Sequence, residues 1–361
     1  ESITELKQHG IADTDTDAAL SAIKAGVDME MTSSSYLGLI NAVKENRFSE
    51  QLLDESVKNV LRIKFKLGLF EEPYTAEGEE YGVHLNNENR ELARRAAAES
   101  MVLLKNNNVL PLKNSSGNYT LLGEWAYNRD LIGWWTGNAN KEDVVTVADG
   151  LNANKSYNVQ IHHTAAPQSS NSDTVIVCLG ESGNIFGENH SRSQLELPWG
   201  QSEQIRQLKE NGKTVIAVIF NGRPLVLSDI YNYADAIIIA WHPGIEAGNA
   251  LADIIFGKVN PSGKLTASFP KKNGQVPLFY SDRRSGRPNH KKYVDVDAEP
   301  LFPFGFGLSY TKFVYQNMIL SKKKILKNET VTVSLDVMNS GDHIGKEVVQ
   351  LYLHDQVATV T

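Results

Sequence analysis

Four side chains that could take part in acid–base chemistry lie close together in one loop of the sequence. They are Glu181, Glu188, His190 and Arg192. Two carboxyl groups can act as a general acid and a general base, and an arginine can orient a neighbouring carboxylate. Most charged loop residues are simply solvated. The residue types therefore make this loop a candidate functional site. The case for function depends on which secondary-structure elements flank the loop.

The segments that flank this loop predict where it lies in the fold. Residues 174–179 form an apolar, β-branched run, typical of a strand buried on both faces of a parallel sheet. Residues 201–209 are helix-like and are followed by Asn211 and Gly212, a common helix stop. In an open α/β sheet, binding and catalytic residues gather in loops at the carboxyl ends of strands. We therefore expect Glu181 to begin such a loop.

The composition is that of a globular protein. The 361 residues are 41% hydrophobic and 22% charged, enough for two or three domains. The net charge of −7 argues against nucleic acid as the main partner. No apolar run approaches the ~20 residues of a membrane span. The single cysteine, Cys178, lies in the apolar run at 174–179 and is expected to be a core residue, so no disulfide can form within the chain.

Residues 1–72 combine helices with one short strand. The pattern predicts helices at 15–24, 37–45 and 50–67, and a strand at 26–31. Thr14 or Asp15 can cap the first helix, and Ser49 can cap the last. Because a whole (β/α)8 barrel needs about 250 residues, we expect the tail of such a barrel. The apolar stripe of its last helix should then depend on other protein to cover it.

Residues 73–95 are polar and are expected to be a linker, whereas residues 96–312 read as a second α/β structure. Strands are expected at 119–125, 158–163, 174–179, 214–220 and 236–241. Helices are expected at 90–106, 201–209 and 245–256. This alternation predicts a mostly parallel sheet covered by helices.

The connection between residues 163 and 174 is too short for a simple parallel crossover. Parallel neighbours need a connection of about a dozen residues or more, usually helical, whereas this segment is polar and contains Pro167. Either the two strands are not neighbours in the sheet, or part of the natural chain is missing there. We expect missing chain near 164–173, with 283–297 as a second such place.

From residue 313 onward, apolar and polar residues alternate. Half-buried strands are expected at 331–337 and 348–353. Because a seven-strand sandwich takes about 100 residues, residues 313–361 are expected to be part of a β-sandwich.

Motifs spread over the whole chain resemble glycoside hydrolase family 3, in particular its bacterial, periplasmic β-glucosidase type. They follow the family's order along the chain. They are ELKQHG at 5–10, AGVDMEM at 25–31, LRIKFKLGLFEEPY at 61–74, AAAESMVLLKNNNVLPL at 96–112, GENHSR at 187–192, LELP at 195–198, NGRPL at 221–225, PSGKLTASFP at 261–270 and FPFGFGLSYT at 302–311.

The resemblance implies an architecture and a mechanism. The architecture is the tail of a (β/α)8 barrel, an α/β sandwich domain and part of a fibronectin type III-like domain. Members of the family hydrolyse β-linked glucosides and related sugars with retention, which needs two carboxyl groups about 5–5.5 Å apart. A barrel aspartate attacks the sugar, and a glutamate of the second domain protonates the leaving oxygen. The aspartate lies in a Ser-Asp-Trp motif that aligns just before Glu1, so the resemblance implies that this chain alone is inactive.

The resemblance also implies roles for individual residues. Glu188, in the family's Gly-Glu…Ser-Arg context, is the expected catalytic acid/base, and Glu181 either holds the loop or binds a sugar hydroxyl. Arg192 either orients Glu188 or neighbouring backbone, or is a plain surface residue. Met31 resembles a sugar-contacting methionine of some relatives, with core packing as its alternative, whereas Met29 is expected in the core. Met31, Glu181 and Arg192 are thus the candidate substrate-binding residues.

These observations favour a retaining β-glucosidase that removes terminal β-D-glucosyl residues in the periplasm or outside the cell. A β-xylosidase or another exo-glycosidase of the family is the alternative, as is a non-catalytic carbohydrate-binding or scaffold fragment. The expected partner is a small oligosaccharide or glucoside, and a second copy of the chain is an open option. Cofactors, nucleic acids and membranes are not expected as partners. No residue is assigned as a metal ligand, and the sequence leaves metal binding open.

Overall fold

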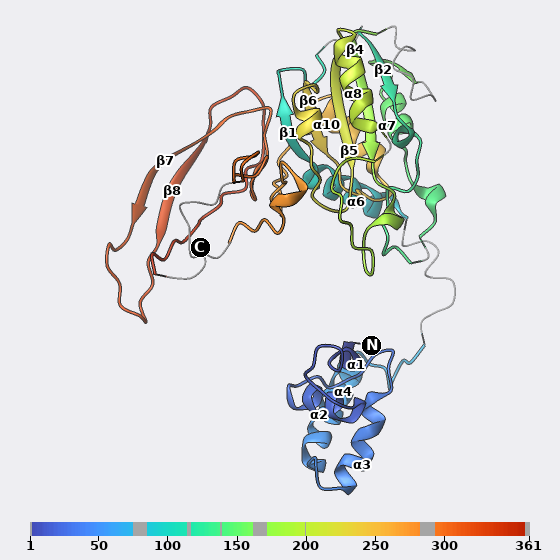
Figure 1. The fold of residues 1–361 in the computed structure, drawn as a ribbon, viewed down its shortest axis with the longest axis vertical. Coiled ribbons are helices and arrows are strands. Elements are labelled where there is room, and N and C mark those ends of the chain that lie inside the picture. Colours follow the sequence, from blue (N-terminus) through green and yellow to red (C-terminus); the bar gives the residue numbers. More distant parts are fainter. Residues whose placement is uncertain are drawn as a thin grey trace. The chain divides into compact units, whose positions relative to one another are not determined.

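The structure is a computed structural model that describes residues 2–74, 85–113, 117–137, 139–161, 172–198, 200–281 and 293–357. The chain forms two compact units, Glu1–His84 and Leu85–Thr361 (Figure 1). Within the described ranges, every helix is too short or too polar to cross a bilayer.

The first unit is a small cluster of helices. Its described residues form the α-helices α1 (Ser2–Glu5), α2 (Asp15–Lys24), α3 (Gly38–Lys44) and α4 (Glu50–Lys66). Thr14 caps α2 by accepting a hydrogen bond from the backbone N–H of Asp17, whereas Ser49 precedes α4 without a side-chain capping bond. Apolar residues of α2 and α3 form the buried core together with Phe48.

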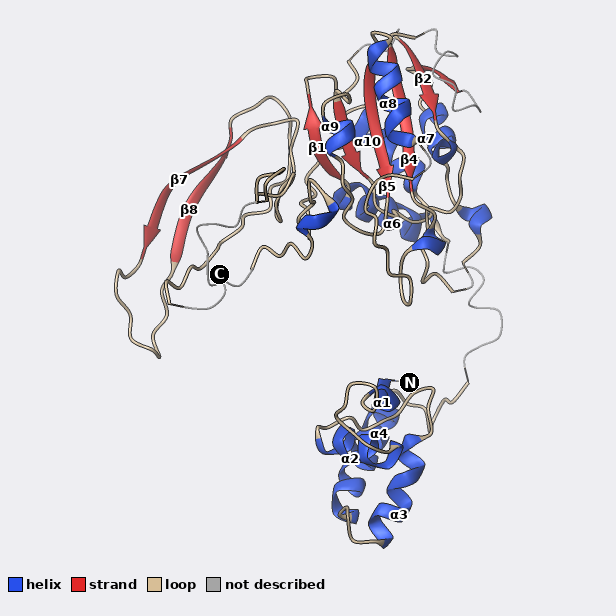
Figure 2. Cartoon of the chain, viewed as in Figure 1, coloured by secondary structure: helices blue, strands red, loops and turns tan. Residues whose placement is uncertain are grey.

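The strand predicted at 26–31 is wrong, because these residues form a loop. The described residues of the first unit contain no strand, so no neighbouring backbone completes a ladder with this segment (Figure 2). Local hydrogen bonds hold it instead. The Glu30 carboxylate accepts bonds from the backbone N–H groups of Ser35 (2.9 Å) and Tyr36 (2.8 Å).

Large apolar side chains of the first unit are exposed instead of packed. Met29, which the sequence places in the core, is 67% exposed, and Met31 is 74% exposed. The predicted apolar stripe is present on α4, but it also faces outward. Its exposed members include Leu52, Val57, Leu61, Ile63 and Phe65. An exposed apolar surface of this kind usually marks a place where other protein packs.

Six strands form the sheet at the centre of the second unit. They are β1 (Val102–Asn106), β2 (Asn118–Leu122), β3 (Asn158–Ile161), β4 (Thr174–Gly180), β5 (Thr214–Phe220) and β6 (Ala236–Ile239). Their order across the sheet is β1-β6-β5-β4-β2-β3. β1 pairs antiparallel with β6, and the other pairs are parallel. This confirms the mostly parallel sheet that the sequence predicts.

Helices cover both faces of the sheet (Figure 2). One face packs against α6 (Asn87–Ser100), α7 (Val147–Ala153) and α10 (Ala247–Ile255). The other packs against α8 (Gln201–Glu210) and α9 (Ser228–Tyr231). Successive residues of a strand point to opposite faces of the sheet. In β4, Ile176 and Cys178 belong to the core on one face, and Val175 and Val177 belong to the core on the other. Cys178 is the core residue expected, and burial raises the pKa of its thiol.

Residues 102–106 are a strand, although the sequence predicts a helix over 90–106. The helix α6 ends at Ser100, and β1 follows it. Val102 and Leu103 are buried in the sheet, where β1 pairs with β6. This pairing outweighs the helix-compatible composition of the segment, because strand formation depends mainly on its neighbours.

β2 lies between β3 and β4 in the sheet. The two strands joined by the short connection are therefore not neighbours, which is one of the two alternatives that the sequence leaves open. The place predicted for missing chain, 164–173, falls mostly outside the described residues, and so does most of 283–297.

The last part of the second unit contains a two-stranded antiparallel ribbon. β7 (Phe313–Leu320) pairs with β8 (Val333–Asn339), which confirms the first of the two strands predicted there. The strand predicted at 348–353 is wrong, because the described residues offer its backbone no partner strand. Side chains hold this segment instead, such as Gln350, whose amide donates to the carbonyl of Gly305 (2.9 Å).

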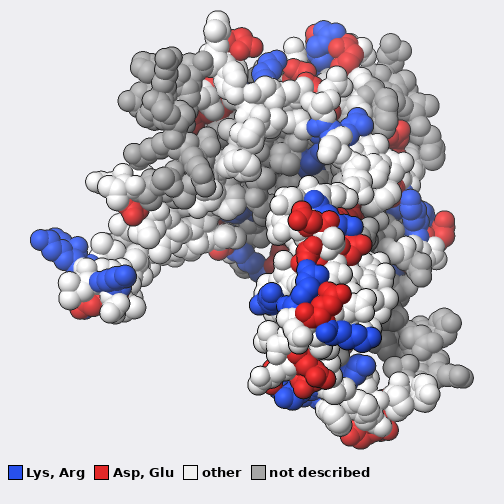
Figure 3. All heavy atoms as spheres, turned by 60° about the horizontal axis from the view of Figure 1, so that its bottom comes forward, with Lys and Arg blue, Asp and Glu red and all other residues white. Residues whose placement is uncertain are grey.

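Charged side chains of both signs are interspersed on the face shown in Figure 3. Among the described residues visible there, no wide area carries a single sign. On α8, Arg206 pairs with both Glu203 (2.6 Å) and Glu210 (2.7 Å).

Candidate functional site

Several loops meet at the carboxyl edge of the sheet, around the loop that carries Glu188. β2, β4, β5 and β6 are parallel, so the segments that follow them emerge at the same edge. The N–H of Glu181 donates to the carbonyl of Phe220 (2.8 Å), and the N–H of Asn221 donates to that of Trp241 (3.3 Å). The segments after β4, β5 and β6 are therefore neighbours from their first residues onward.

Glu181 is buried at the end of β4. Its side chain is 1% exposed and forms an ion pair with Arg223, which comes from the segment after β5. Its second carboxylate oxygen, Oε2, has no hydrogen-bond partner among the described residues. A carboxylate buried against an arginine holds two segments together. The geometry therefore favours the loop-holding alternative for Glu181 over contact with a sugar.

Glu188 lies in the exposed outer part of the same loop. The loop around it is braced by aromatic contacts. Nδ1 of His190 lies 2.7 Å from the carbonyl oxygen of Glu188, and the His190 ring packs edge-on against Trp134 with the ring centroids 5.0 Å apart. Gly187 has a φ of +111° and lies against the same tryptophan, where a Cβ would come within 3.1 Å of the ring. The loop thus presents the Glu188 carboxyl group to solvent from a defined backbone.

Arg192 is also exposed, close to Glu188 in the sequence. No ion pair between described residues joins the two side chains. Arg192 therefore does not orient Glu188 through an ion pair in this structure, and it is exposed. Its contact with a substrate stays a prediction.

Asp130, which no sequence motif marks, ties a second loop to the start of the Glu188 loop. Its Oδ2 accepts hydrogen bonds from the N–H of Gly183 (3.1 Å) and the hydroxyl of Ser182 (3.2 Å), and its Oδ1 pairs with Lys141 (3.0 Å). Burial by itself would raise the pKa of the Asp130 carboxyl, but these donors hold the pKa below its ordinary value of 3.8. Asp130 meets the loop only because β2 pairs with β4.

Asp130→Asn should lower the stability of the protein in a pH-dependent way. Because its folded-state pKa is depressed, the ionised carboxylate stabilises the fold fully above the ordinary value of 3.8. That contribution is lost as the pH falls through the lower folded-state pKa. The urea midpoints of the wild type and of Asp130→Asn, measured from about pH 7 down to about pH 3, should therefore become more similar as the pH falls. A difference between the two urea midpoints that stays constant over this pH range would contradict a stabilising role of the Asp130 charge.

An aromatic layer lies beneath these loops. Trp125 is 1% exposed and stacks on Phe220 at the end of β5, with the ring centroids 5.8 Å apart. His242 packs against both Trp125 (6.3 Å) and Phe186 (5.0 Å). Burial lowers the pKa of His242, so its ring is neutral at neutral pH. These rings form a packed base on which the Glu188 loop rests.

The predicted site residues are thus distributed over both units. Glu181, Glu188 and Arg192 share one loop of the second unit, whereas Met31 belongs to the first unit and is exposed there. Arg223 could have been found from the sequence, because it lies in the NGRPL motif directly after a predicted strand. The described residues hold no cluster of three or more His, Cys, Asp or Glu side chains placed to bind a metal.

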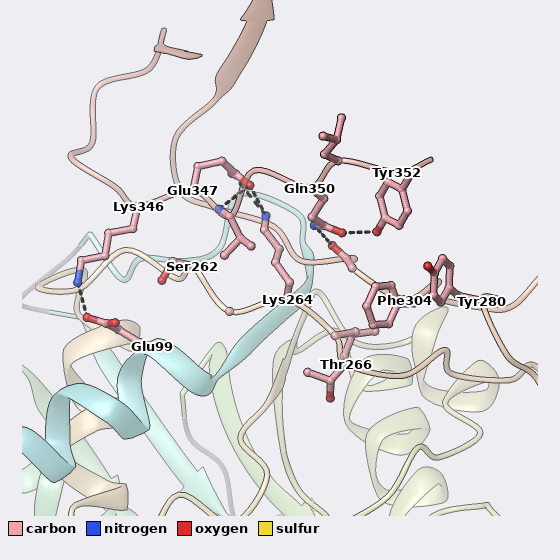
Figure 4. A pocket seen from close by; sticks show the side chains of 15 residues that line it. Glu99, Ser262, Lys264, Thr266, Tyr280, Phe304, Lys346, Glu347, Gln350 and Tyr352 are labelled. Carbon is pink, nitrogen blue, oxygen red and sulfur yellow. Dashed lines mark hydrogen bonds and ion pairs between the residues drawn. The ribbon is translucent and has the colours of Figure 1, made fainter. Parts of the chain in front are cut away.

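A pocket of about 680 Å³ lies elsewhere in the second unit, between residues 262–266 and the segment 346–352 (Figure 4). Its charged side chains are already paired, as Lys264 is with Glu347 (3.2 Å). The Glu188 loop contributes no residue to it. We therefore place the candidate site on the loop and interpret the pocket as the seam where the last segment packs on the sheet domain.

Comparison with known proteins gives consistent matches over nearly the whole chain. Residues 101–310 match the model of the glycosyl hydrolase family 3 C-terminal domain. The chain is 35% identical over 410 residues to a periplasmic beta-glucosidase of Salmonella typhimurium, with 99% of this chain and 54% of that protein covered. It is 36% identical over 388 residues to a beta-xylosidase of Formosa agariphila, with 98% and 53% covered. The chain thus spans about half the length of the curated relatives it matches.

Solved structures show the same fold. The structure of a beta-glucosidase from Listeria innocua in complex with glucose matches with a TM-score of 0.88 and 35% identity, covering 99% of this chain and 52% of that one. A mutant of the same enzyme in complex with laminaribiose matches with a TM-score of 0.85 and 34% identity, covering 95% and 51%. These likenesses confirm the fold class that the sequence predicts.

Proposed function

The chain belongs to glycosyl hydrolase family 3, and we propose that it supplies the general acid/base of a retaining β-glucosidase. The observation that carries the proposal is the position of Glu188. It stands exposed in the loop after β4, at the carboxyl edge of a parallel sheet, within the residues that match the family model. The β-glucosidases among the relatives support the same reaction class.

In the proposed reaction, Glu188 acts twice. Its carboxyl group first gives its proton to the glycosidic oxygen, while a nucleophilic carboxylate bonds to the anomeric carbon and the bond to the leaving oxygen breaks. The Glu188 carboxylate then takes a proton from water, whose oxygen attacks the anomeric carbon and displaces the nucleophile. The resemblance to the family assigns the nucleophile to an aspartate that lies outside these 361 residues.

The other candidate residues have supporting roles in this proposal. Glu181 holds the loop through Arg223, although contact with a sugar hydroxyl remains its alternative. Arg192 and Met31 are exposed, and in this proposal both contact the substrate. The periplasmic relative supports a location in the periplasm or outside the cell.

We propose terminal, non-reducing β-D-glucosyl residues as the substrate. A β-xylosidase is the second candidate, because a relative of that activity is 36% identical to this chain. A panel of aryl β-glycosides, assayed with the complete gene product, separates the two. The highest kcat/KM is expected for the glucoside. A higher value for the xyloside would favour the second candidate, and no turnover of any glycoside would favour a non-catalytic carbohydrate-binding protein.

A further inference from the structure

One arginine contacts both ends of the loop that carries Glu188. Nη2 of Arg223 forms the ion pair with Glu181, the first residue of the loop. Nη1 of the same guanidinium donates to the backbone carbonyl of Gln194, near the end of the loop (3.0 Å). The two contacts lie on either side of Glu188 in the sequence, so one side chain closes the loop at its base.

Arg223 is itself held in place by the segment after β5. Nδ2 of Asn221 donates to the carbonyl of Arg223 (2.7 Å). The N–H of Val226 donates to the carbonyl of Leu195, directly beyond the end of the loop (2.7 Å). The segment 221–226 therefore supports the arginine and also bonds to the chain that leaves the loop.

The middle of the loop packs on the same segment. The ring of Phe186 lies over Gly222, where a Cβ would come within 2.1 Å of a ring carbon. Phe186 also packs against His242 in the aromatic layer. The loop thus rests on apolar contacts in its middle and on the Arg223 guanidinium at its two ends.

Burial and charge make the contacts of Arg223 hard to replace. The side chains of Arg223 and Glu181 are 15% and 1% exposed. Removing either partner leaves a charge at this depth without its counter-charge, which is unfavourable. The planar guanidinium can bond to a carboxylate and a carbonyl in fixed directions at once, whereas the compact ammonium of lysine cannot reproduce that fork.

We propose that Arg223 is a positioning residue that clasps the two ends of this loop and thereby sets the place of the Glu188 carboxyl group. The inference rests on the proposed role of Glu188 as the acid/base. Proton transfer needs the acid within hydrogen-bond reach of the leaving oxygen, and a displacement of about 1 Å can cost about 10²-fold in rate. Loosening the clasp lowers kcat for glycosides with poor leaving groups and changes KM little.

Hydrogen–deuterium exchange on the complete gene product tests the clasp without reference to activity. In Arg223→Lys, peptides that cover 182–194 should exchange more than about tenfold faster than in the wild type, with the strands of the sheet unchanged. Glu181→Gln removes the charge but keeps the shape, and it should loosen the same peptides. Arg206→Lys, at an exposed arginine of α8, is the matched control and should change nothing there.

Kinetics of the same variants test the consequence for Glu188. Arg223→Lys should slow the first step, glycosylation, by about 10–100-fold for glycosides with poor leaving groups and spare that step for those with good leaving groups. The comparison is made on the first step because the second step needs the Glu188 carboxylate with every substrate. Azide should not restore turnover, because the Glu188 carboxylate is still present. If Arg223 served folding alone, the rates for all substrates would fall by the same factor, in proportion to the folded fraction of the protein.

The outcomes separate the clasp from the proposed function. Unchanged exchange at 182–194 in both loop variants would overturn the clasp, as would failure of both to fold, since these residues would then serve the fold and not the loop. Faster exchange with equal losses for all leaving groups would overturn the link to Glu188. If exchange is faster in the Arg223 and Glu181 variants but Glu188→Gln keeps full activity, the proposed role of Glu188 is wrong, whereas the role of Arg223 in holding the loop is supported.

Discussion

In the complete gene product, Glu188→Gln should slow the hydrolysis of glycosides with poor leaving groups by about 10²–10⁴-fold. The substitution keeps the shape of the side chain but removes the proton that the departing oxygen needs. Dinitrophenyl glycosides release a stable anion and should keep near-normal glycosylation. Rates of the first step across a series of leaving groups should therefore depend far more steeply on leaving-group basicity in the variant than in the wild type.

Azide should restore turnover in Glu188→Gln. In the proposed reaction, the second step needs the Glu188 carboxylate to take a proton from water. An anionic nucleophile needs no base, so azide can attack the glycosyl–enzyme intermediate directly. The product should be a β-glycosyl azide, and its configuration can be read from its proton NMR spectrum.

Glu181→Gln is the matched control for this experiment. Glu181 is buried against Arg223, whereas Glu188 is exposed, so the two carboxyl groups of one loop lie in different environments. Glu181→Gln retains Glu188 and should therefore show no rescue by azide. If azide rescues Glu181→Gln and not Glu188→Gln, Glu181 is the acid/base. If both variants keep full activity, the resemblance to the family does not extend to this loop.

The 361-residue chain expressed by itself should self-associate or bind a partner through its first unit. Met31, Ile63 and Phe65 are 74%, 55% and 60% exposed there, with other large apolar side chains around them. Burying such side chains is worth about 25 cal/mol per Å² of apolar surface, so association is favourable. Light scattering after gel filtration should show species larger than a monomer, and a hydrophobic dye should bind strongly.

Polar substitutions on α4 test whether this surface is responsible. Ile63→Gln combined with Phe65→Gln should reduce both self-association and dye binding. Lys64→Gln, which lies between them in the sequence and changes no apolar surface, is the control and should not. A monomeric chain that unfolds cooperatively and binds no dye would contradict the prediction. A discrete dimer would identify the second copy of the chain that the sequence leaves open as a partner.

The central strands and the site loop could be predicted from the sequence. β4 and β5 are runs of β-branched and apolar residues, and their positions agree with those expected. A segment that is apolar on both faces must be buried on both faces, and a strand in a covered parallel sheet provides that environment. The loop after β4 could be placed for the same reason, since it must emerge at the carboxyl edge.

The wrong predictions concern segments whose state depends on a distant partner. Residues 26–31 and 348–353 have strand-like composition, but the described residues provide no neighbouring strand for either. Residues 102–106 read as helix, yet they pair with β6. Local composition cannot decide such cases, because the hydrogen bonds that define a strand belong to two segments and not to one.

The sequence by itself determined that Glu181, Glu188 and Arg192 share one loop, because they are close along the chain. Only the tertiary structure decided that Glu181 is buried and Glu188 is exposed, and which side chains hold the loop. Asp130 and Arg223 reach it because β2 and β5 flank β4 in the sheet. Strand order follows from the packing of the whole domain, so these contacts exist only once the sheet has formed.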